Sequence, residues 1–380
     1  MSSLRIAAIF CAAVGLYDVV YVYFTFSGGP AIGPRHTVLF PDFLVFDAAV
    51  RAWREGKLAL IYDVDAFSAF QNAGLHFRPF LYPPTWLLML LPLGAIAVGK
   101  AYALFMTTTA AIATALEGWR DWPGWLAVVV SPAAAWVVLS GQNTFLSLGL
   151  FYGGLHLLPR APIAAGVLLG LLAYKPQIWV LVPLALIAAR QWNALAALLA
   201  AVAALALASL GLFGLDFWRA FFAAARVASS TAATELMFEQ MHVQMTTLLA
   251  AARMVGIPAG LAGLLQIAGA VLAVAAVWFA FRRRGPGTAQ TAVLAAATFL
   301  VSPYTLNYDL LLLMPAVVAL HRLGAAQGFL PGERILHALL WLLPTLGWML
   351  NQLGLPVIPL VILLFGATAW KRAGEHAKTA

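Results

Sequence analysis

Long apolar segments alternate with short polar ones along the whole chain. Apolar runs at or near membrane length lie at 4–26, 95–117, 124–139, 143–158, 162–189, 193–213, 258–281, 288–303, 306–320, 334–350 and 355–370. A helix needs about 20 predominantly apolar residues to cross a bilayer, where it satisfies its own backbone hydrogen bonds. The pattern predicts an all-α, polytopic membrane protein with about 11 or 12 membrane helices in one domain, 1–380. Several runs are closer to about 15 residues, which is typical of helices that border a cavity.

A polar island at 28–84 is the longest interruption of this pattern. The chain has 14 acidic residues, and five of them fall in the island: Asp42, Asp47, Glu55, Asp63 and Asp65. A carboxylate beside a membrane is costly unless it is hydrated, paired or used in function. The island is therefore the first place to look for chemistry.

Residues 42–56 of the island have the pattern of an amphipathic helix. Asp42 stands at the N-cap or in the first turn, and Gly56 stands at the C-terminal end. The apolar positions recur at helical spacing: Phe43, Phe46, Val50 and Trp53. Such a helix is expected to lie on the membrane surface. Asp42 could cap the helix, present a carboxylate to a membrane-embedded substrate, or do both.

The chain then returns to the membrane through a second short helix at 65–73 and the stiff step Tyr82-Pro83-Pro84. The stretch 83–93 is too short to span a bilayer, so it is expected to be re-entrant or to lie at the surface. In the apolar run 162–189, Lys175-Pro176 predicts a break, because proline cannot continue the helical hydrogen-bond ladder. The alternative is one long kinked helix that carries a snorkelling or buried lysine.

Composition supports the membrane assignment and removes other classes. The 380 residues are 63% hydrophobic and 9% charged, with a mean hydropathy of +0.91. Soluble domains carry about 25% charged residues. The net charge of +8 is expected to mark cytoplasmic loops and contacts with anionic membrane lipids, not nucleic acid. With Cys11 as the single cysteine, no disulfide within the chain and no cysteine-rich metal site is possible.

Arginine and lysine in the short loops predict the orientation. The cytoplasmic markers are Arg160, Arg190, Arg282–Arg284, His321-Arg322 and Lys371-Arg372. The loops 140–143, 174–177, 302–309 and 351–352 then lie outside, as does 215–243, which is expected to be an amphipathic surface helix. Charge alone leaves the polar island open. It is external if Arg5 is inside, whereas its own basic residues mildly favour the reverse.

Short motifs in a fixed order carry a resemblance to a known family. They are Asp42-Phe43-x-Val45-Phe46, Gly56 with Tyr62-Asp63, Phe80-x-Tyr82-Pro83-Pro84, Gly141-Gln142-Asn143, Lys175-Pro176 and Ser302-Pro303. From about residue 4 to residue 320 the chain resembles glycosyltransferase family 87, the polyprenyl-phosphate-mannose-dependent mannosyltransferases of the GT-C superfamily. It departs from that pattern at Phe46, where tyrosine is commoner, and it is on the short side.

The resemblance implies a GT-C-like helical bundle in the cell membrane, with its active site on the external or periplasmic face. Such enzymes move a sugar from a polyprenyl-phosphate donor to a lipid or glycan acceptor, usually with inversion. An acidic residue early in the first external loop acts as general base, and Asp42 matches that position. Asp47 is the second choice, because it faces a different side of the helix. No cofactor and no metal is expected.

The leaving phosphate needs positive charge or N–H donors. Lys175 is the first candidate, and Arg78, His76 and His242 are weaker ones; His36 could contact either substrate. The residues expected to line the cavity and hold sugar hydroxyls are Tyr82, Gln142, Asn143, Asn307, Tyr308 and Asp309. Helix capping and loop ends are the alternative explanation for these polar residues. Asp309 heads an apolar run, so it is expected to be hydrated or paired, with Lys175 as a possible partner.

Two other functions are compatible with a membrane protein of this pattern. A transporter or flippase of lipid-linked sugars would show broken helices at matched positions of two repeats, and the break at Lys175-Pro176 has no clear counterpart. An inert scaffold subunit would tolerate substitution of Asp42 and of Lys175.

Overall fold

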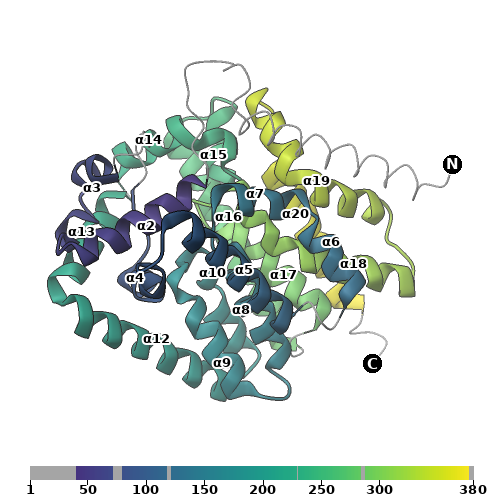
Figure 1. The fold of residues 1–380 in the computed structure, drawn as a ribbon. Helices are drawn as coiled ribbons and strands as arrows, with labels where there is room; N and C mark the ends of the chain where they lie inside the picture. The colour runs from purple at the N-terminus through teal and green to yellow at the C-terminus, as the bar shows by residue number, and fades with distance from the viewer. Residues whose placement is uncertain (1–39, 72–78, 118–120, 229, 284–286, 376–380) are drawn as a thin grey trace.

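The computed structural model describes residues 40–71, 79–117, 121–228, 230–283 and 287–375 (Figure 1). It is 82% helix, and the described residues form no strand. One isolated bridge joins Met245 to Leu306. The predicted all-α fold is confirmed. The apolar run 4–26 and the site candidates His36, His76 and Arg78 lie outside the described residues.

The helices follow one another with short connections. In chain order they are α2 (Pro41–Arg54), η1 (Leu58–Leu60), α3 (Val64–Gln71), α4 (Pro84–Leu90), η2 (Leu91–Leu93), α5 (Val98–Leu116), α6 (Trp122–Val129), α7 (Pro132–Ser140), α8 (Thr144–Leu157), α9 (Pro162–Leu171), η4 (Leu172–Tyr174), α10 (Pro176–Trp179), α11 (Val182–Ala188), α12 (Trp192–Phe213), α13 (Leu215–Ala228), α14 (Thr231–Met241), η5 (His242–Gln244), α15 (Leu248–Met254), α16 (Ala259–Arg283), α17 (Thr288–Val301), η6 (Asn307–Leu313), α18 (Met314–Gln327), α19 (Glu333–Gln352) and α20 (Ile358–Glu375).

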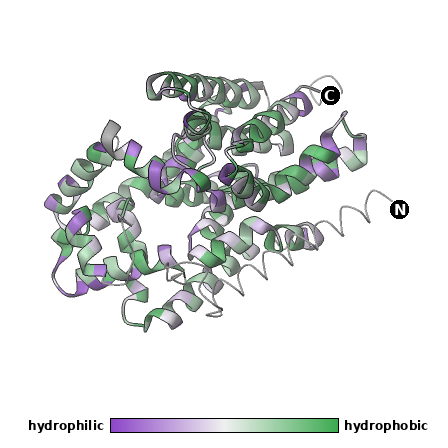
Figure 2. Cartoon of the chain, turned by 90° about the horizontal axis from the view of Figure 1, so that it is seen from above, coloured by the Kyte–Doolittle hydropathy of each residue, from purple (hydrophilic) through white to green (hydrophobic). Residues whose placement is uncertain are grey.

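Many of these helices are apolar enough to lie within a membrane. Within the described residues, three are long enough to cross one alone: Trp192–Phe213, Ala259–Arg282 and Asn307–Gln327. Two bent pairs also qualify as broken spans, α4–η2 with α5 at 111° and α6 with α7 at 55°. Figure 2 shows hydrophobic residues dominating the helices of the bundle. The chain is a polytopic membrane protein, and its shorter apolar helices match the short runs in the sequence.

The polar loops gather at one end of the bundle. Loop 174–177 touches two others, since Lys175 bonds Asn143 at 3.1 Å and Asp309 at 2.5 Å. Asn351 donates to the backbone oxygen of Val243 at 3.1 Å. Two of the predicted cytoplasmic markers form ion pairs: Arg322 pairs with Asp121 and Arg372 with Glu333, both at 2.5 Å. These contacts bring predicted external loops together, and the side of the membrane on which each loop lies stays a prediction.

The amphipathic helix α2 forms where the sequence predicted it, but its apolar side is covered by protein. Phe43 and Phe46 are each 1% exposed. Their rings lie 5.4 Å from Phe105 of α5 and 5.5 Å from Trp86 of α4. The apolar stripe therefore packs against protein, while the position of the helix at the membrane surface stays a prediction. Aromatic neighbours cover the stripe, and burying each phenylalanine away from water stabilises the fold by about 1.5–3 kcal/mol.

Two other elements near the site refine the prediction. The stretch 83–93 forms α4 and η2, which turn by 111° before α5, in keeping with a re-entrant or surface segment. The expected single surface helix at 215–243 is instead two helices, α13 and α14, followed by η5. The sequence has Ser229-Ser230 between the residues of α13 and α14, and serine is a residue type that competes with the helix for backbone hydrogen bonds.

Candidate active site

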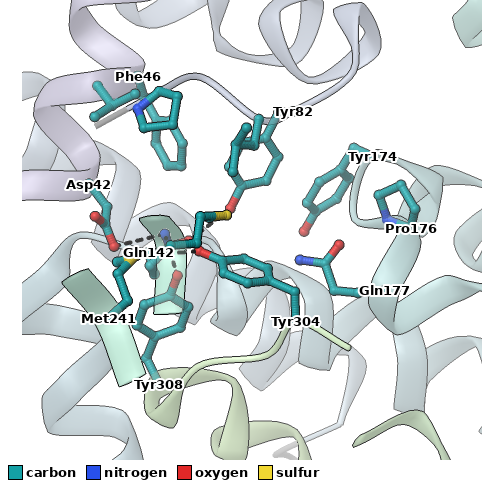
Figure 3. Close-up of a pocket in the computed structure, with 14 residues that line it drawn as sticks. Asp42, Phe46, Tyr82, Gln142, Tyr174, Pro176, Gln177, Met241, Tyr304 and Tyr308 are labelled. Atoms are coloured by element: carbon teal, nitrogen blue, oxygen red, sulfur yellow. Dashed lines mark hydrogen bonds between the residues drawn. The ribbon is translucent and has the colours of Figure 1, made fainter. Parts of the chain in front are cut away.

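A cavity of about 150 Å³ opens at the polar end of the bundle (Figure 3). It lies between the N-terminus of α2, the stretch 79–82, the start of α10, the end of α14 and the turn before η6. The residues that line it are Asp42, Val45, Phe46, Pro79, Leu81, Tyr82, Gln142, Tyr174, Pro176, Gln177, Met237, Met241, Tyr304 and Tyr308. One side is apolar and the other carries hydroxyls, amides and a carboxylate. This mixture suits a ligand with both hydroxyl groups and an apolar part.

Asp42 reaches the cavity because α2 begins beside it. Pro41 occupies the first helical turn, where its fixed φ suits the helix start, and Phe40 precedes it with φ 41°. The ring of Phe40 stacks on Tyr102 of α5 at 4.2 Å, which anchors this helix end. Asp42 therefore lies in the first turn and is not the N-cap residue. The positive end of the helix dipole stabilises its negative charge there.

Gln142 meets Asp42 because α7 ends against the start of α2. Gly141 closes α7 with φ 73°, in the left-handed region that glycine tolerates best. A Cβ on Gly141 would lie 2.6 Å from the Cβ of Phe43, so only glycine lets the two elements approach this closely. Gln142 follows directly and is 4% exposed.

The amide of Gln142 is the centre of a hydrogen-bond network (Figure 3). Its Nε2 donates to Asp42 Oδ2 at 2.9 Å and to the hydroxyl oxygen of Tyr308 at 3.2 Å. Its Oε1 accepts from the hydroxyl of Tyr82 at 3.0 Å and from the backbone N–H of Asn143 at 3.3 Å. Three residues far apart in the sequence are thereby tied to one side chain.

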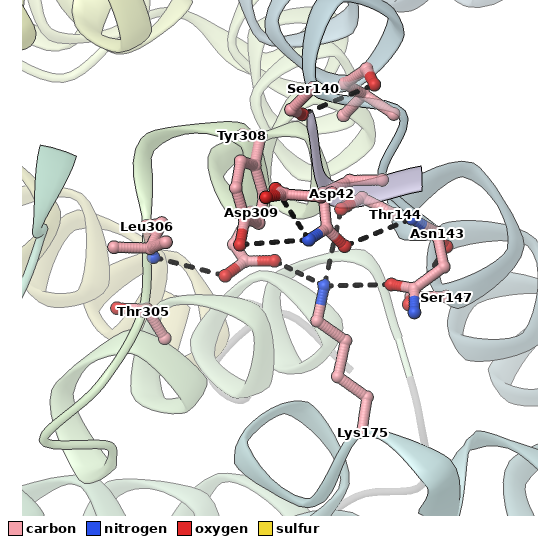
Figure 4. Close-up of polar contacts among 12 residues, drawn as sticks. Asp42, Ser140, Asn143, Thr144, Ser147, Lys175, Thr305, Leu306, Tyr308 and Asp309 are labelled. Atoms are coloured by element: carbon pink, nitrogen blue, oxygen red, sulfur yellow. Dashed lines mark hydrogen bonds and ion pairs between the residues drawn. The ribbon is translucent and has the colours of Figure 1, made fainter. Parts of the chain in front are cut away.

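Lys175 and Asp309 form a buried ion pair below this network (Figure 4). They are 1% and 2% exposed, and Lys175 Nζ lies 2.5 Å from Asp309 Oδ1. The ammonium also donates to Asn143 Oδ1 at 3.1 Å and Thr144 Oγ1 at 3.4 Å. Asp309 Oδ2 accepts the backbone N–H of Leu306 at 3.1 Å. The pair that the sequence suggested is present, and neither residue lines the cavity.

The helix break at Lys175-Pro176 is confirmed. η4 ends at Tyr174, Lys175 has φ −121° and ψ 77°, and α10 starts at Pro176. The break lets the lysine turn into the bundle toward Asp309, while Tyr174 and Gln177 on either side face the cavity (Figure 3).

Of the other residues expected at the site, Tyr82 and Tyr308 line the cavity. Asn143 and Asn307 are fully buried and do not line it. Asn307 Oδ1 accepts the backbone N–H of Tyr308 at 3.1 Å. His242 also lies off the cavity lining, with Nδ1 3.0 Å from the backbone oxygen of Phe238.

Burial changes the pKa of two titratable groups, Tyr82 and Asp47. It raises the pKa of Tyr82 well above its usual range, with smaller contributions from the charges of Asp309 and Asp42, so this hydroxyl keeps its proton. Burial also raises the pKa of Asp47, against the opposing effect of Arg51. Asp47 does not line the cavity, as its position on the helix predicted.

Most lining residues were not predicted as site residues, among them Tyr174, Gln177, Met237, Met241 and Tyr304. These five lie in segments predicted to be external, 174–177, 215–243 and 302–309. The stacking of Tyr174 on Trp86, at 4.4 Å, is a contact between distant segments that no local pattern reveals. Within the described residues, no group of three or more histidine, cysteine or acidic side chains could hold a metal ion.

A helical membrane bundle with a carboxylate, aromatic rings and amides around one cavity is an arrangement suited to sugar chemistry. Comparison with known families makes this specific. The chain belongs to glycosyltransferase family 87, whose family model matches residues 80–303, more than half of its length. The protein is therefore a membrane glycosyltransferase with a sugar donor and an acceptor as substrates. No curated protein and no solved structure matches the chain.

The family model matches a shorter range than the motifs indicated, 80–303 instead of about 4–320. It includes Tyr82, Gln142, Asn143 and Lys175. Asp42 lies before it and Asp309 lies after it, so these two are connected to the matched part by the contacts described above.

Proposed function

We propose that the protein transfers a hexose, mannose first among them, from a polyprenyl-phosphate donor to a hydroxyl of a lipid or glycan acceptor. Asp42 is the general base, and the sugar carbon inverts. The observation that carries this proposal is the position of Asp42. Its carboxylate lines the cavity, at a helix N-terminus, and an amide holds it in place.

The reaction is a single displacement. Asp42 takes the proton of the acceptor hydroxyl as that oxygen forms a bond to C1 of the sugar. The bond between C1 and the phosphate oxygen breaks on the opposite face, and its electron pair leaves with the polyprenyl phosphate. Retention would need a second carboxylate about 5–5.5 Å from the first as nucleophile. Asp42 is the one acidic residue among the described cavity-lining residues, which favours inversion.

The phosphate requires a cation or N–H donors, and Lys175 is the first candidate because it is a lone lysine in apolar surroundings beside a helix break. Its ammonium is bound to Asp309 beneath the cavity, so a direct contact requires it to exchange this carboxylate for the phosphate. Arg78 and His36 are proposed as further contacts because Arg78 adjoins the lining residue Pro79 and His36 precedes α2 in the sequence. Asn143, Asn307 and His242 are proposed only as support around the substrate.

The aromatic residues of the cavity are proposed to hold the sugar ring. Tyr304 and Tyr308 line the cavity with aromatic rings and hydroxyl groups, and Tyr174 lies beside them with its ring stacked on Trp86. Such side chains pack against the C–H face of a sugar while their hydroxyls bond its oxygen atoms. The apolar positions Leu81, Met237 and Met241 would then face the lipid part of a substrate.

A direct assay tests the proposal. Purified protein is incubated with radiolabelled polyprenyl-phosphate mannose, with and without lipid acceptors extracted from membranes. We expect label to appear in an acceptor-dependent product, with the anomeric configuration opposite to that of the donor. Movement of intact donor across a liposome membrane without any product would support the transporter instead. Transfer with retained configuration would contradict the single displacement.

A further inference from the structure

Gln142 was expected to hold sugar hydroxyls, but its contacts assign it another role. We propose that Gln142 is a positioning residue that orients the Asp42 carboxylate for proton transfer. The inference rests on the proposed function of Asp42 and deepens it.

The hydrogen-bonding capacity of Gln142 is fully used by protein groups. Its two amide hydrogens are donated to Asp42 Oδ2 and the Tyr308 hydroxyl oxygen, and its Oε1 accepts from the Tyr82 hydroxyl and the N–H of Asn143. A substrate hydroxyl could bond this amide only by displacing one of them.

The backbone fixes which end of the amide faces the carboxylate. The N–H of Asn143 can only donate, so the atom beside it must be the acceptor Oε1. The opposite atom, Nε2, then points at Asp42 and Tyr308. A donor held against a carboxylate stabilises its ionised form and restricts its rotation.

The same arrangement gives Tyr308 a defined polarity. Its hydroxyl oxygen accepts from Gln142, so its own proton is directed elsewhere, and Tyr308 lines the cavity. Tyr308 is therefore the hydroxyl placed to donate to a substrate oxygen. The Tyr82 hydroxyl, in contrast, donates its proton to Gln142 Oε1.

The support of Gln142 is rigid, as positioning requires. The residue is 4% exposed and follows Gly141, which packs directly on Phe43 beside the base. Tyr82 is itself held, because its backbone oxygen accepts the hydroxyl of Tyr62 at 2.8 Å. Little reorganisation is needed before the reaction.

Gln142→Glu provides the test. A second carboxylate in contact with Asp42 makes the pair share a proton, which raises the pH at which Asp42 becomes ionised. Activity needs ionised Asp42, so the acidic limb of the pH profile of kcat/KM should move up by about one pH unit or more. Gln142→Met, which removes the donor, should lower kcat about 100-fold with little change in the KM for the donor.

Gln266→Glu is the matched control. Gln266 is another buried amide whose partners are the backbone groups of Leu249, Leu300 and Ser302. The Gln266→Glu variant places a carboxylate at a site that does not touch Asp42. The acidic limb of its kcat/KM pH profile should therefore stay at the wild-type position. An equal shift in both variants would overturn the inference.

An infrared titration gives a readout that does not depend on transfer. The carboxylate band that disappears in Asp42→Asn identifies Asp42, and its midpoint should rise in Gln142→Glu but not in Gln266→Glu. An unchanged midpoint overturns the positioning role, even if wild-type protein transfers sugar. Absence of transfer in wild-type protein would instead remove the proposed function, while the titration still decides whether Gln142 controls Asp42.

Discussion

Lys175 and Asp309 are buried charges whose presence in an apolar bundle depends on each other. Both are almost inaccessible, and each also bonds a neighbouring polar group. Removing one partner of such a pair leaves an uncompensated buried charge and costs about 3–5 kcal/mol, whereas replacing both with apolar groups is often neutral. This asymmetry can separate a structural from a catalytic role for Lys175.

We predict that Lys175→Met lowers the stability of the protein by about 3–5 kcal/mol and that Lys175→Met/Asp309→Leu recovers most of the loss. Thermal unfolding in detergent measures both. If Lys175 also meets the leaving phosphate, the double variant will fold but transfer sugar about 100-fold more slowly or worse. A double variant no more stable than the single one would contradict the account of the pair.

Some site residues were predictable singly. Asp42 stood out as a carboxylate at a helix start in an apolar chain, and Lys175 as a lysine that needed a partner. Tyr174 and Tyr304 look like ordinary aromatic residues in the sequence. Their role depends on where the loops meet, which local patterns do not encode.

At the scale of elements, the junction of α7 with α2 decides whether Gln142 meets Asp42. Gly141 carries this junction because its φ of 73° and its contact with Phe43 both exclude a side chain. Gly354 has nearly the same backbone, with φ 74°, but a Cβ there would meet nothing within 4 Å. An alanine at Gly354 therefore adds backbone strain alone, whereas an alanine at Gly141 adds the same strain and also displaces α2.

We predict that Gly141→Ala and Gly354→Ala each lose about 1 kcal/mol or somewhat more of stability from the left-handed backbone. Only Gly141→Ala should also slow transfer, by about 10-fold or more, because the new methyl group pushes Phe43 and Asp42 away from Gln142. Transfer rates and thermal unfolding of both variants provide the check. Equal activity in the two would show that this junction does not control the site.

The sequence predicted α2 itself, because capping and periodicity are local. It did not predict that protein would cover the helix. A stripe such as Phe43, Phe46 and Val50 looks the same whether it faces lipid or Trp86 and Phe105. The division of 215–243 into α13 and α14 was also not predicted, because two serines in a sequence weaken a helix without always ending it.

At the scale of the molecule, hydropathy predicted most of the fold, because the apolar runs indicated the helices. The sides of the membrane that the basic loops indicate stay a prediction. The bent pairs, α4 with α5 and α6 with α7, were harder to predict, because short helices become one broken span only through their neighbours.

We predict that the cavity end faces the outside of the cell. With Cys11 replaced by serine, a cysteine at the exposed Gln352 near the cavity end should react with an impermeant thiol reagent in intact cells. A cysteine at the exposed Arg160, at the end of α8 remote from the cavity, should react only after the membrane is opened. The opposite labelling pattern would place the site in the cytoplasm.

Replacing Asp42 by its amide shows whether this carboxylate is the base. Asp42→Asn keeps the size of the side chain but cannot take the proton, so kcat should fall by about 100-fold to 10,000-fold while the protein stays folded. Asp47→Asn, on the same helix but off the cavity lining, is the control and should transfer at nearly the wild-type rate. Transfer by Asp42→Asn within a few-fold of wild type would contradict the account.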